Sequence, residues 1–587
     1  MKNFFKIFFA SLLALIVFTM LAFFVFIGII GLIASASSSD APKIESKSVL
    51  VLNLSQSYPE QSKDDPFNAL MNKSDNEIPS LYDLVRMIKY AKTDTLVKGI
   101  YIQGSDNSNG FGASEEIRKA LADFKTSKKF IWSYAETMSQ KAYYVTSVSD
   151  FVAVHPQGGL EFFGMSSNLF FLKGMLEKLD IQPQIFYAGK FKSATEPLRE
   201  YKMTDANRLQ TSVWLEDLYR HMLTSIGSSR QLDTASLRQL AVTGAIQTAA
   251  DAKNKQLIDE LLYDDQFKAM LNKKLGNTTN EKTNFVTFND YARSADFRQT
   301  GSSRIALVFA DGDIDGSNES EGQIGSDAYR TLLRKIRLDN SIKAVVIRVN
   351  SPGGSALASD VIWRELELIK KDKPVIVSMG DVAASGGYYI SCNADSIFAN
   401  ENTITGSIGV FSVVPNMEKF FQNKIGVSFD RVKTGPFADL GGIDRALTEP
   451  EKRFFQSSVD SIYHTFKTRV ADGRKKTVES VDTIAQGRVW TGKRALTVGL
   501  VDRTGTLQDA VNCAARLGKL SSYTVREYPE KKSFFDKLTG SFEKSIRQKM
   551  LKQELDEVAW RWLDECKKIK QMAGVPQTKM PFSFEVR

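Results

Sequence analysis

Apolar and polar positions alternate along most of the chain in a way typical of an α/β protein. Short apolar runs such as AVVIRV and PVIVSM are followed by amphipathic stretches such as ASDVIWRELELIKK. An apolar run of about four to eight residues predicts a buried strand, and apolar residues spaced three and four apart predict a helix. Strands that alternate with helices predict a largely parallel sheet, so the predicted fold class is α/β.

The N-terminus departs from this pattern. No charged residue occurs between Ile7 and Ser39, and this window exceeds the ~20 apolar residues that span a bilayer. Lys2 and Lys6 precede it, so the positive-inside rule keeps them in the cytoplasm and exports the rest. Residues 1–39 are thus predicted to be a cytoplasmic tip and one transmembrane signal anchor. The small residues of SASASSSD leave open the alternative of a cleaved signal peptide.

The strand-helix pattern occurs twice, at an offset of about 245 residues. LVKGIYIQG in the first copy corresponds to SIKAVVIRVN in the second, and KALADFKTSKKFIWSYAE corresponds to RELELIKKDKPVIVSMGD. Tyr143-Tyr144 likewise matches Tyr388-Tyr389. The preserved order of the matches predicts a tandem repeat of one β-α unit.

The doubling divides the chain into four regions. The anchor is followed by a first α/β repeat over 46–300, a second over 301–530, and a tail over 531–587. In the tail, apolar residues recur every fourth position, at Leu538, Phe542, Ile546 and Met550. This spacing predicts an amphipathic basic helix that packs on the body or a neighbouring subunit, or that lies on anionic lipid.

The composition limits which kinds of catalytic or metal site the chain can form. The chain has three cysteines without pair spacing and only three histidines, so a disulfide framework, a zinc site or a Ser-His-Asp triad has little material. The net charge of +9 is concentrated in residues 1–39 and 531–587. For a membrane-tethered chain this distribution favours contact with inner-membrane lipid over nucleic acid.

The two copies differ where catalytic chemistry is expected. In MGDVAASGGYYI of the second copy, Ser385 stands between Ala384 and Gly386. Small neighbours between a strand and a helix are typical of a nucleophile elbow. The first copy has Gln140 at the equivalent position. Only the second repeat therefore offers a serine nucleophile.

A serine nucleophile needs a base, and the doubling points to a lysine. GKFKSATEP of the first copy aligns with GPFADLGG of the second, which places Lys192 opposite Ala438. One copy thus has the lysine without the serine, and the other has the serine without the lysine. A composite site is the prediction, provided that burial lowers the lysine pKa toward ~7–8. Lys190 is the main competitor for this role.

Acyl transfer also needs donors for an oxyanion. The backbone N–H groups of Gly353 and Gly354 in NSPGGSA, and that of Gly386, are the candidates. Ser407 in TGSIG stands opposite Phe162 of the first copy. Its hydroxyl is a candidate for orienting the lysine amine.

The motifs NSPGGS, GDVAASGGYY, NTITGSIGV and GKFKSATEP resemble those of the signal peptide peptidase A family in its long two-repeat form. The resemblance implies a Clp-protease/crotonase-like fold and a Ser-Lys endopeptidase that degrades cleaved signal peptides at the cytoplasmic membrane. It assigns Ser385 as nucleophile and Lys192 as general base. It also implies a homotetramer, a catalytic body that faces the periplasm of a bacterium, and no cofactor or metal.

Two other functions remain open at this point. A crotonase-like enzyme acting on acyl-CoA would also use paired backbone donors, although it needs neither a serine nucleophile nor export. A catalytically silent membrane scaffold would need only the packing of the two repeats. The sequence also leaves open whether Ser385 meets Lys192 within one chain or across two.

Overall fold

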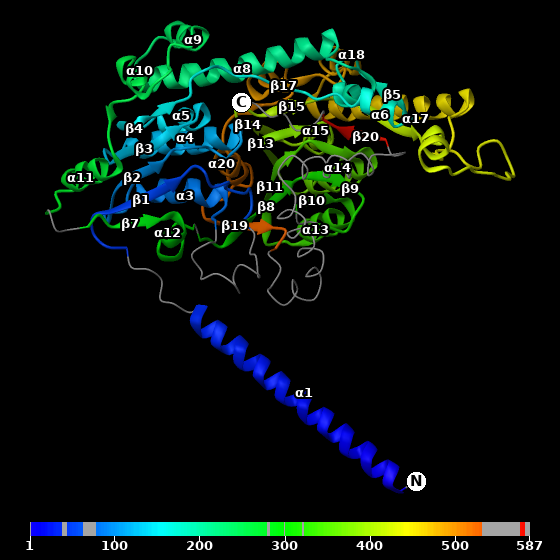
Figure 1. Cartoon of the computed structure of the whole chain (residues 1–587), viewed down its shortest axis with the longest axis horizontal. Helices are drawn as coiled ribbons and strands as arrows, with labels where there is room; N and C mark the ends of the chain where they lie inside the picture. Colours follow the sequence, from blue (N-terminus) through cyan, green and yellow to red (C-terminus); the bar gives the residue numbers. More distant parts are fainter. Residues whose placement is uncertain are drawn as a thin grey trace.

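The structure of the 587-residue chain is a computed structural model, shown in Figure 1. It describes residues 2–37, 44–62, 78–278, 282–298, 300–319, 322–530 and 576–580. Most of the tail therefore lies outside the described residues, including the predicted amphipathic helix with its apolar stripe.

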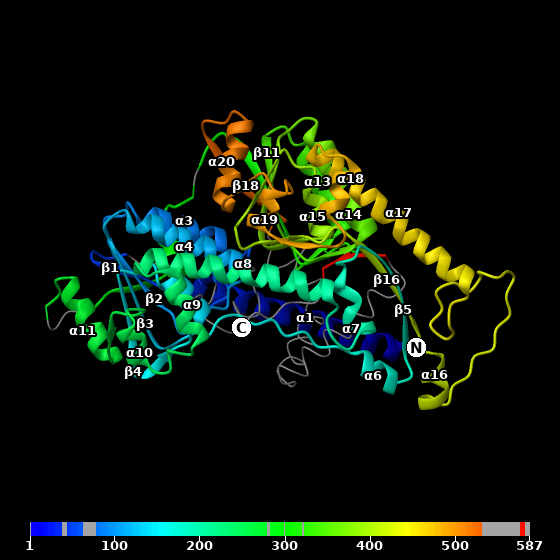
Figure 2. The same ribbon diagram turned by 90° about the horizontal axis from the view of Figure 1, so that it is seen from above.

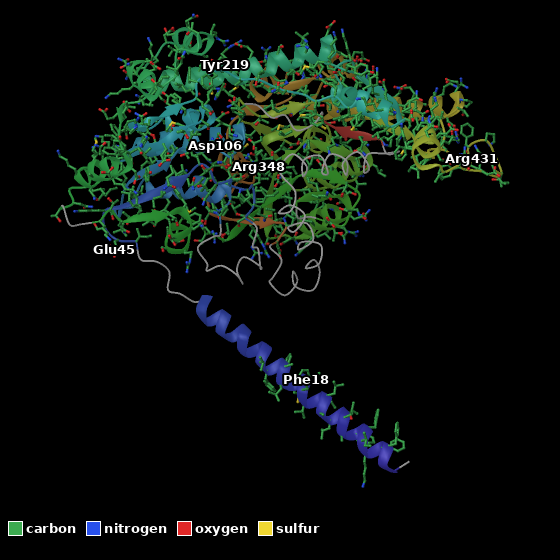
Figure 3. The ribbon with its side chains drawn as sticks, viewed as in Figure 1. Phe18, Glu45, Asp106, Tyr219, Arg348 and Arg431 are labelled. Carbon is green, nitrogen blue, oxygen red and sulfur yellow. The ribbon has the colours of Figure 1, made fainter. Side chains whose placement is uncertain are left out.

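Helix α1 (Lys2–Ser37) extends away from the α/β body in Figures 1 and 3, where Phe18 marks its middle. Its segment Phe4–Val25, of 22 residues and mean hydropathy 2.7, is long and apolar enough to cross a membrane, and none of it is buried against the body. By length and composition this helix matches the predicted membrane anchor.

Two parallel sheets form the body and share one strand order. The first runs β7-β1-β2-β3-β4-β6, and the second, which has eight strands, contains the corresponding path β19-β8-β11-β13-β14-β18. Strands of the first sheet are β1 (Ser48–Asn53), β2 (Val97–Gln103), β3 (Phe130–Met138), β4 (Phe151–Leu160), β6 (Glu260–Leu261) and β7 (Phe285–Thr287). Strands of the second are β8 (Ser303–Asp311), β11 (Ile342–Ser351), β13 (Val375–Ala384), β14 (Ser396–Ala399), β18 (Arg503–Thr504) and β19 (Tyr523–Tyr528). The matching order confirms the predicted doubling.

Helices follow the strands of both repeats, and several of them pack on the two sheets. In the first repeat they are α3 (Leu81–Ala91), α4 (Phe111–Lys125), α5 (Gln140–Thr146), α6 (Lys173–Lys178), α7 (Glu196–Arg199), α8 (Asp205–Arg230), α9 (Thr234–Val242), α10 (Ala249–Asn254), α11 (Asp264–Lys274) and α12 (Phe288–Ser294). In the second they are α13 (Ser326–Leu338), α14 (Ala356–Lys370), α15 (Gly386–Ser391), α16 (Glu418–Phe420), α17 (Glu449–Arg474), α18 (Val478–Ile484), α19 (Gly492–Thr497) and α20 (Leu507–Leu517). Helix α8 reaches from its own repeat onto the second, where it packs on β17 (Val489–Thr491) and β17 continues the sheet through β15 (Ile404–Gly406) (Figures 1 and 2).

A third sheet joins the two repeats, in the order β10-β9-β12-β20-β16-β5. Strand β5 (Gln182–Ala188) of the first repeat pairs antiparallel with β16 (Val410–Asn416) of the second, and Figure 2 shows them side by side. The other members are β9 (Asp313–Asp315), β10 (Gln323–Gly325), β12 (Gly353–Ser355) and β20 (Gln577–Lys579). This sheet brings the end of β5, and with it the candidate lysine, to the second repeat.

A buried ionic cluster also holds the repeats together. Arg348 of β11 is 1% exposed and lies at the centre of the body in Figure 3. Its guanidinium donates two hydrogen bonds, of 2.8 and 2.9 Å, to Glu60 of the first repeat. It also lies 2.8 Å from Glu116 of α4. A charged group that is paired on several sides in the interior leaves uncompensated charges when one partner is removed.

Arg348→Met is therefore expected to lower the stability of the body by about 3–5 kcal/mol, because it leaves two carboxylates buried without a cation. The measurement is the urea midpoint of the solubilised chain, followed by far-ultraviolet circular dichroism. Lys268→Met is the control, since Lys268 and Asp264 form an ion pair with both side chains about half exposed. The control is expected to cost at most about 0.5 kcal/mol. Equal midpoints for the two variants would show that the cluster does not hold the repeats together.

Candidate active site

Ser385 occupies the turn between β13, which ends at Ala384, and α15, which begins at Gly386. Its backbone has φ 55° and ψ −112°, a conformation that is strained for a residue with a Cβ. The turn is secured by a hydrogen bond of 2.8 Å from the Ser385 amide to the Gly406 carbonyl. A strained serine held between a strand and a helix is the geometry that the sequence predicted.

Lys192 follows β5 and enters the same site from the first repeat. Its Nζ lies 2.8 Å from Ser385 Oγ, within one chain. Nζ also lies 3.1 Å from both the carbonyl oxygen and the hydroxyl oxygen of Ser407. The structure therefore brings Lys192, Ser385 and Ser407 together, and answers the question of whether one chain can supply both groups. The side chain of the competitor Lys190 is exposed.

Burial controls the protonation of this lysine. Lys192 is 1% exposed and Ser385 has no exposed surface. Burial lowers the pKa of the Lys192 amine well below its ordinary value of 10.5, because desolvation disfavours the ammonium form. A neutral amine has two N–H groups and one lone pair. The two oxygens of Ser407 can accept the N–H groups, so that the lone pair faces the Ser385 hydroxyl.

The lysine is positioned by residues that were not among the predicted site residues. A Cβ on Gly487 would lie 2.7 Å from the Lys192 Cα, and one on Gly409 would lie 3.1 Å from its Cδ. The Phe191 amide donates to the Gln486 carbonyl at 2.7 Å, and the Gln210 side chain donates to the Phe191 carbonyl at 3.0 Å. The sequence does contain a signal for these positions, namely the last glycine of TGSIG and the glycine of AQGR. A lysine loop that closely approaches another backbone segment requires glycine there.

The candidate oxyanion donors lie at the same place. Gly353 and Gly354 form the start of β12 with φ of 101° and 158°, and Gly386 begins α15 directly after the serine. A Cβ on Gly386 would lie 3.1 Å from the Gly353 Cα, so the two segments touch. The Gly353 amide already donates to Ser351 Oγ at 3.1 Å. The amides of Gly354 and Gly386 therefore remain the candidate donors.

The equivalent place in the first repeat is filled by a side chain. The Gln140 amide oxygen accepts hydrogen bonds from the backbone amides of Phe163 and Gly164, at 3.1 and 3.0 Å. Its nitrogen donates to the Gly164 carbonyl at 2.9 Å. Phe162, which stands opposite Ser407 in the alignment, is fully buried. The first repeat thus closes its own site and contributes the lysine to the site of the second repeat.

A serine hydroxyl within hydrogen-bond reach of a buried amine is a geometry suited to hydrolysis. The fold and the site define a serine hydrolase built from two α/β repeats. The model of peptidase family S49 matches the chain twice, over residues 123–277 and 367–521. The chain belongs to this family.

Named relatives show the same membership over most of the chain. Protease 4 of Salmonella typhi is 37% identical over 481 residues, which cover 80% of this chain and 77% of the relative. Protease 4 of Haemophilus influenzae is 34% identical, with 82% and 81% covered. The chloroplastic serine protease SPPA of Arabidopsis thaliana is 33% identical, with 74% and 65% covered. This chain is therefore a serine peptidase of the long two-repeat form.

A solved structure of a ClpP1 mutant from Listeria monocytogenes is similar at 15% identity and a TM-score of 0.24, over 35% of this chain and 94% of that one.

Family membership decides among the alternatives left by the sequence. It supports a peptidase, and it excludes both the acyl-CoA enzyme and the silent scaffold. The apolar helix α1 and the Protease 4 relatives together indicate attachment to a membrane.

Ser407→Ala tests the orientation of the lysine. Removing the hydroxyl leaves one N–H of Lys192 without its acceptor, so the lone pair is no longer aimed at Ser385. We expect kcat for a model peptide to fall by about 10 to 100-fold with KM nearly unchanged. Ser147→Ala is the control, because Ser147 is equally buried and accepts a hydrogen bond from Arg118 of the first repeat. A loss of kcat of the same size in the control would assign the effect to packing.

Proposed function

We propose that the chain is a membrane-anchored endopeptidase with a Ser385-Lys192 dyad, which degrades cleaved signal peptides at the cytoplasmic membrane of a bacterium. The observation that carries the proposal is the 2.8 Å contact between Lys192 Nζ and Ser385 Oγ in a fully buried site. A neutral lysine within hydrogen-bond reach is a competent general base for a serine hydroxyl.

The proposed reaction has two halves. Ser385 Oγ attacks the carbonyl carbon of the scissile peptide bond while Lys192 Nζ takes the hydroxyl proton. The amides of Gly354 and Gly386 donate to the resulting oxyanion. The ammonium of Lys192 then gives its proton to the leaving amine, and an acyl-enzyme forms. A water molecule next gives a proton to Lys192 and attacks the ester carbonyl. The Lys192 ammonium then returns that proton to Ser385 Oγ as the acid leaves, which restores both groups.

Signal peptides fit this site as extended apolar chains. A peptide that adds as a strand beside β12 would present its carbonyls to the two glycine amides. A relative named putative signal peptide peptidase SppA, from Enterococcus faecium, is 35% identical over 259 residues, and its name supports this substrate class. Anchoring through α1 would hold the body beside peptides that remain in the membrane.

The test uses the full chain in phospholipid nanodiscs. One substrate is a synthetic cleaved signal peptide, and the other is the same peptide still joined to its exported domain. We expect fragments of the first by mass spectrometry, none with Ser385→Ala, and no loss of the joined form. Equal cleavage of soluble polar peptides and signal peptides would contradict the substrate class and leave the dyad standing.

Topology and assembly complete the proposal. Because Lys2 and Lys6 precede the apolar segment, we place the body in the periplasm, anchored by a single pass in the inner membrane. We further propose a homotetramer without cofactor or metal. Cysteine labelling of the body from the periplasmic side, and the mass of the detergent-solubilised particle, check these two statements.

A further inference from the structure

Strand β20 (Gln577–Lys579) comes from the far C-terminal part of the chain, yet it lies inside the sheet that borders the active site. It stands between β12, which carries the candidate oxyanion glycines, and β16, and it is drawn in red in Figure 1. It pairs antiparallel with β12 in the register Gly353↔Lys579, Gly354↔Thr578 and Ser355↔Gln577. On its other side Gln577 pairs with Phe411 of β16.

Backbone contacts continue beyond the strand at both ends. The Met580 amide donates to the Pro352 carbonyl at 2.7 Å, and the Ala356 amide donates to the Pro576 carbonyl at 3.3 Å. The Thr578 hydroxyl donates to the Gly354 carbonyl at 3.1 Å. Residues 576–580, which we call the C-terminal strand segment, are therefore held by main-chain pairing of the kind that binds extended peptides.

The segment lies beside the candidate oxyanion glycines and next to the residue that follows Ser385. A Cβ placed on Gly353 would lie 2.1 Å from the Thr578 carbonyl oxygen and 2.6 Å from the Gly386 amide nitrogen. The carbonyl of Thr578 thus lies beside the amide that follows the nucleophile. With the segment in place, neither Ser385 nor Thr578 has exposed surface. A second peptide cannot occupy the same edge of β12 at the same time.

Two side chains of the segment have specific partners in the body. The Lys579 amine lies 2.7 Å from an Asp313 carboxylate oxygen of β9. Met580 is 6% exposed and belongs to a buried apolar cluster. The other buried members of this cluster are Trp214, Leu218, Ala384, Ile404 and Val489.

We propose that the C-terminal strand segment is a resident ligand of the peptide-binding cleft, which substrates must displace. The proposal rests on the proposed function, because it takes the β12 edge as the substrate site. The segment also shows which peptides the cleft accepts. They are extended chains with a large apolar side chain in the pocket of Trp214 and Leu218, preceded by a basic side chain that meets Asp313.

Peptide binding in the absence of catalysis tests the occupancy. The full chain with Ser385→Ala is titrated with a fluorescent VPQTKMPF peptide, which repeats residues 575–582. Adding Met580→Asp places a carboxylate in the apolar pocket and releases the resident segment. We expect the Kd for the peptide to fall by at least about tenfold, since a site that is open only part of the time binds in proportion to its open fraction.

The control substitution is Val242→Asp, because Val242 is 74% exposed on α9 and far from the site in sequence. It is expected to leave the Kd unchanged. A second pair of variants separates the effect of releasing the segment from any direct effect of the new aspartate on peptide binding. A chain that ends at residue 575 should bind the peptide as tightly as the Met580→Asp variant, whereas one that ends at 580 should bind like the parent. Equal Kd values for the parent and both releasing variants would overturn the proposal.

A further experiment tests whether Asp313 recognises the lysine side chain of the bound peptide. A peptide in which glutamate replaces the lysine should bind the Met580→Asp chain at least about tenfold more weakly, because it meets the Asp313 carboxylate. Asp313→Lys should reverse this preference. An unchanged preference would refute the role of Asp313.

The same releasing variants are also made in a chain that keeps Ser385, and their hydrolysis rates are measured. This experiment separates the present proposal from the proposed function. Release of the segment should raise kcat/KM for a peptide substrate by at least about tenfold. Tight peptide binding without any hydrolysis would contradict the Ser-Lys dyad and leave the resident segment standing. Hydrolysis that is unaffected by releasing the segment would contradict the resident segment and leave the dyad standing. Intact mass confirms that each chain still carries its own C-terminus.

Discussion

Ser385→Ala is expected to lower kcat for peptide hydrolysis by about 10⁴ to 10⁶-fold, because the proposed reaction loses the oxygen atom that forms the acyl-enzyme. The substitution should not disturb the fold. Alanine keeps the Cβ of the strained turn, and the backbone hydrogen bond from residue 385 to Gly406 needs no side chain. The measurement is the initial rate on a fluorogenic peptide, together with labelling by a fluorophosphonate.

The doubled chain supplies a matched control for this variant. Gln140 occupies the place in the first repeat that Ser385 occupies in the second, and its side chain bonds only to backbone groups of its own repeat. Gln140→Ala should leave kcat within about threefold of the parent and should retain the fluorophosphonate label at Ser385. Persistent labelling in the Ser385→Ala chain would show that another residue is the nucleophile.

Lys192→Met is expected to abolish turnover to a similar extent and, at neutral pH, to stabilise the protein. The pKa of Lys192 is lowered well below 10.5 by burial. Between that lowered pKa and the unfolded value near ~10.4, the unfolded chain binds a proton that the folded chain does not bind. The wild-type chain therefore gains stability from this group as pH rises through the window, by about 1.4 kcal/mol per pH unit. At lower pH the parent chain loses this stability, whereas a methionine binds no proton in either state and does not lose it.

The stability advantage of Lys192→Met over the parent should thus be largest near neutral pH and shrink as pH rises toward 10. Thermal midpoints of both chains at successive pH values measure it. The catalytic counterpart is an acid limb in kcat/KM, since activity is lost as pH falls through the folded pKa and the ammonium can no longer accept a proton. Lys190→Met is the control, because the Lys190 side chain is exposed. A stability advantage that does not change with pH would mean that Lys192 is charged in the folded protein.

Much of the site was accessible from sequence because the duplication makes a comparison inside one chain possible. A lone lysine or a lone serine carries little signal, but the loss of Ser385 in one copy and of Lys192 in the other is informative. Local pattern also sufficed for β11, β13 and α15, which are short elements with strong apolar or small-residue signatures.

Long-range pairing was not accessible in the same way. Strand β20 has the sequence QTK, which shows no alternation of apolar and polar residues, and its partners lie more than 160 residues away. The junction of the repeats was equally hidden, because Glu60 and Arg348 are charged residues that a sequence pattern places at the surface. Their burial follows from mutual pairing across two units. The internal bond of the Gly353 amide to Ser351 likewise depends on a turn geometry that the letters SPGG do not specify.

The origin of the two proposed catalytic groups within a single polypeptide has a genetic consequence. Lys192 and Ser385 meet across the β5–β16 pair of one chain. Two alleles, one altered at each position, therefore encode polypeptides that are each missing half of a site. Co-expression should restore no activity even if the products assemble together, so the two alleles should fail to complement. A gene for such a protein behaves as one indivisible unit of function, although its product contains the same fold twice.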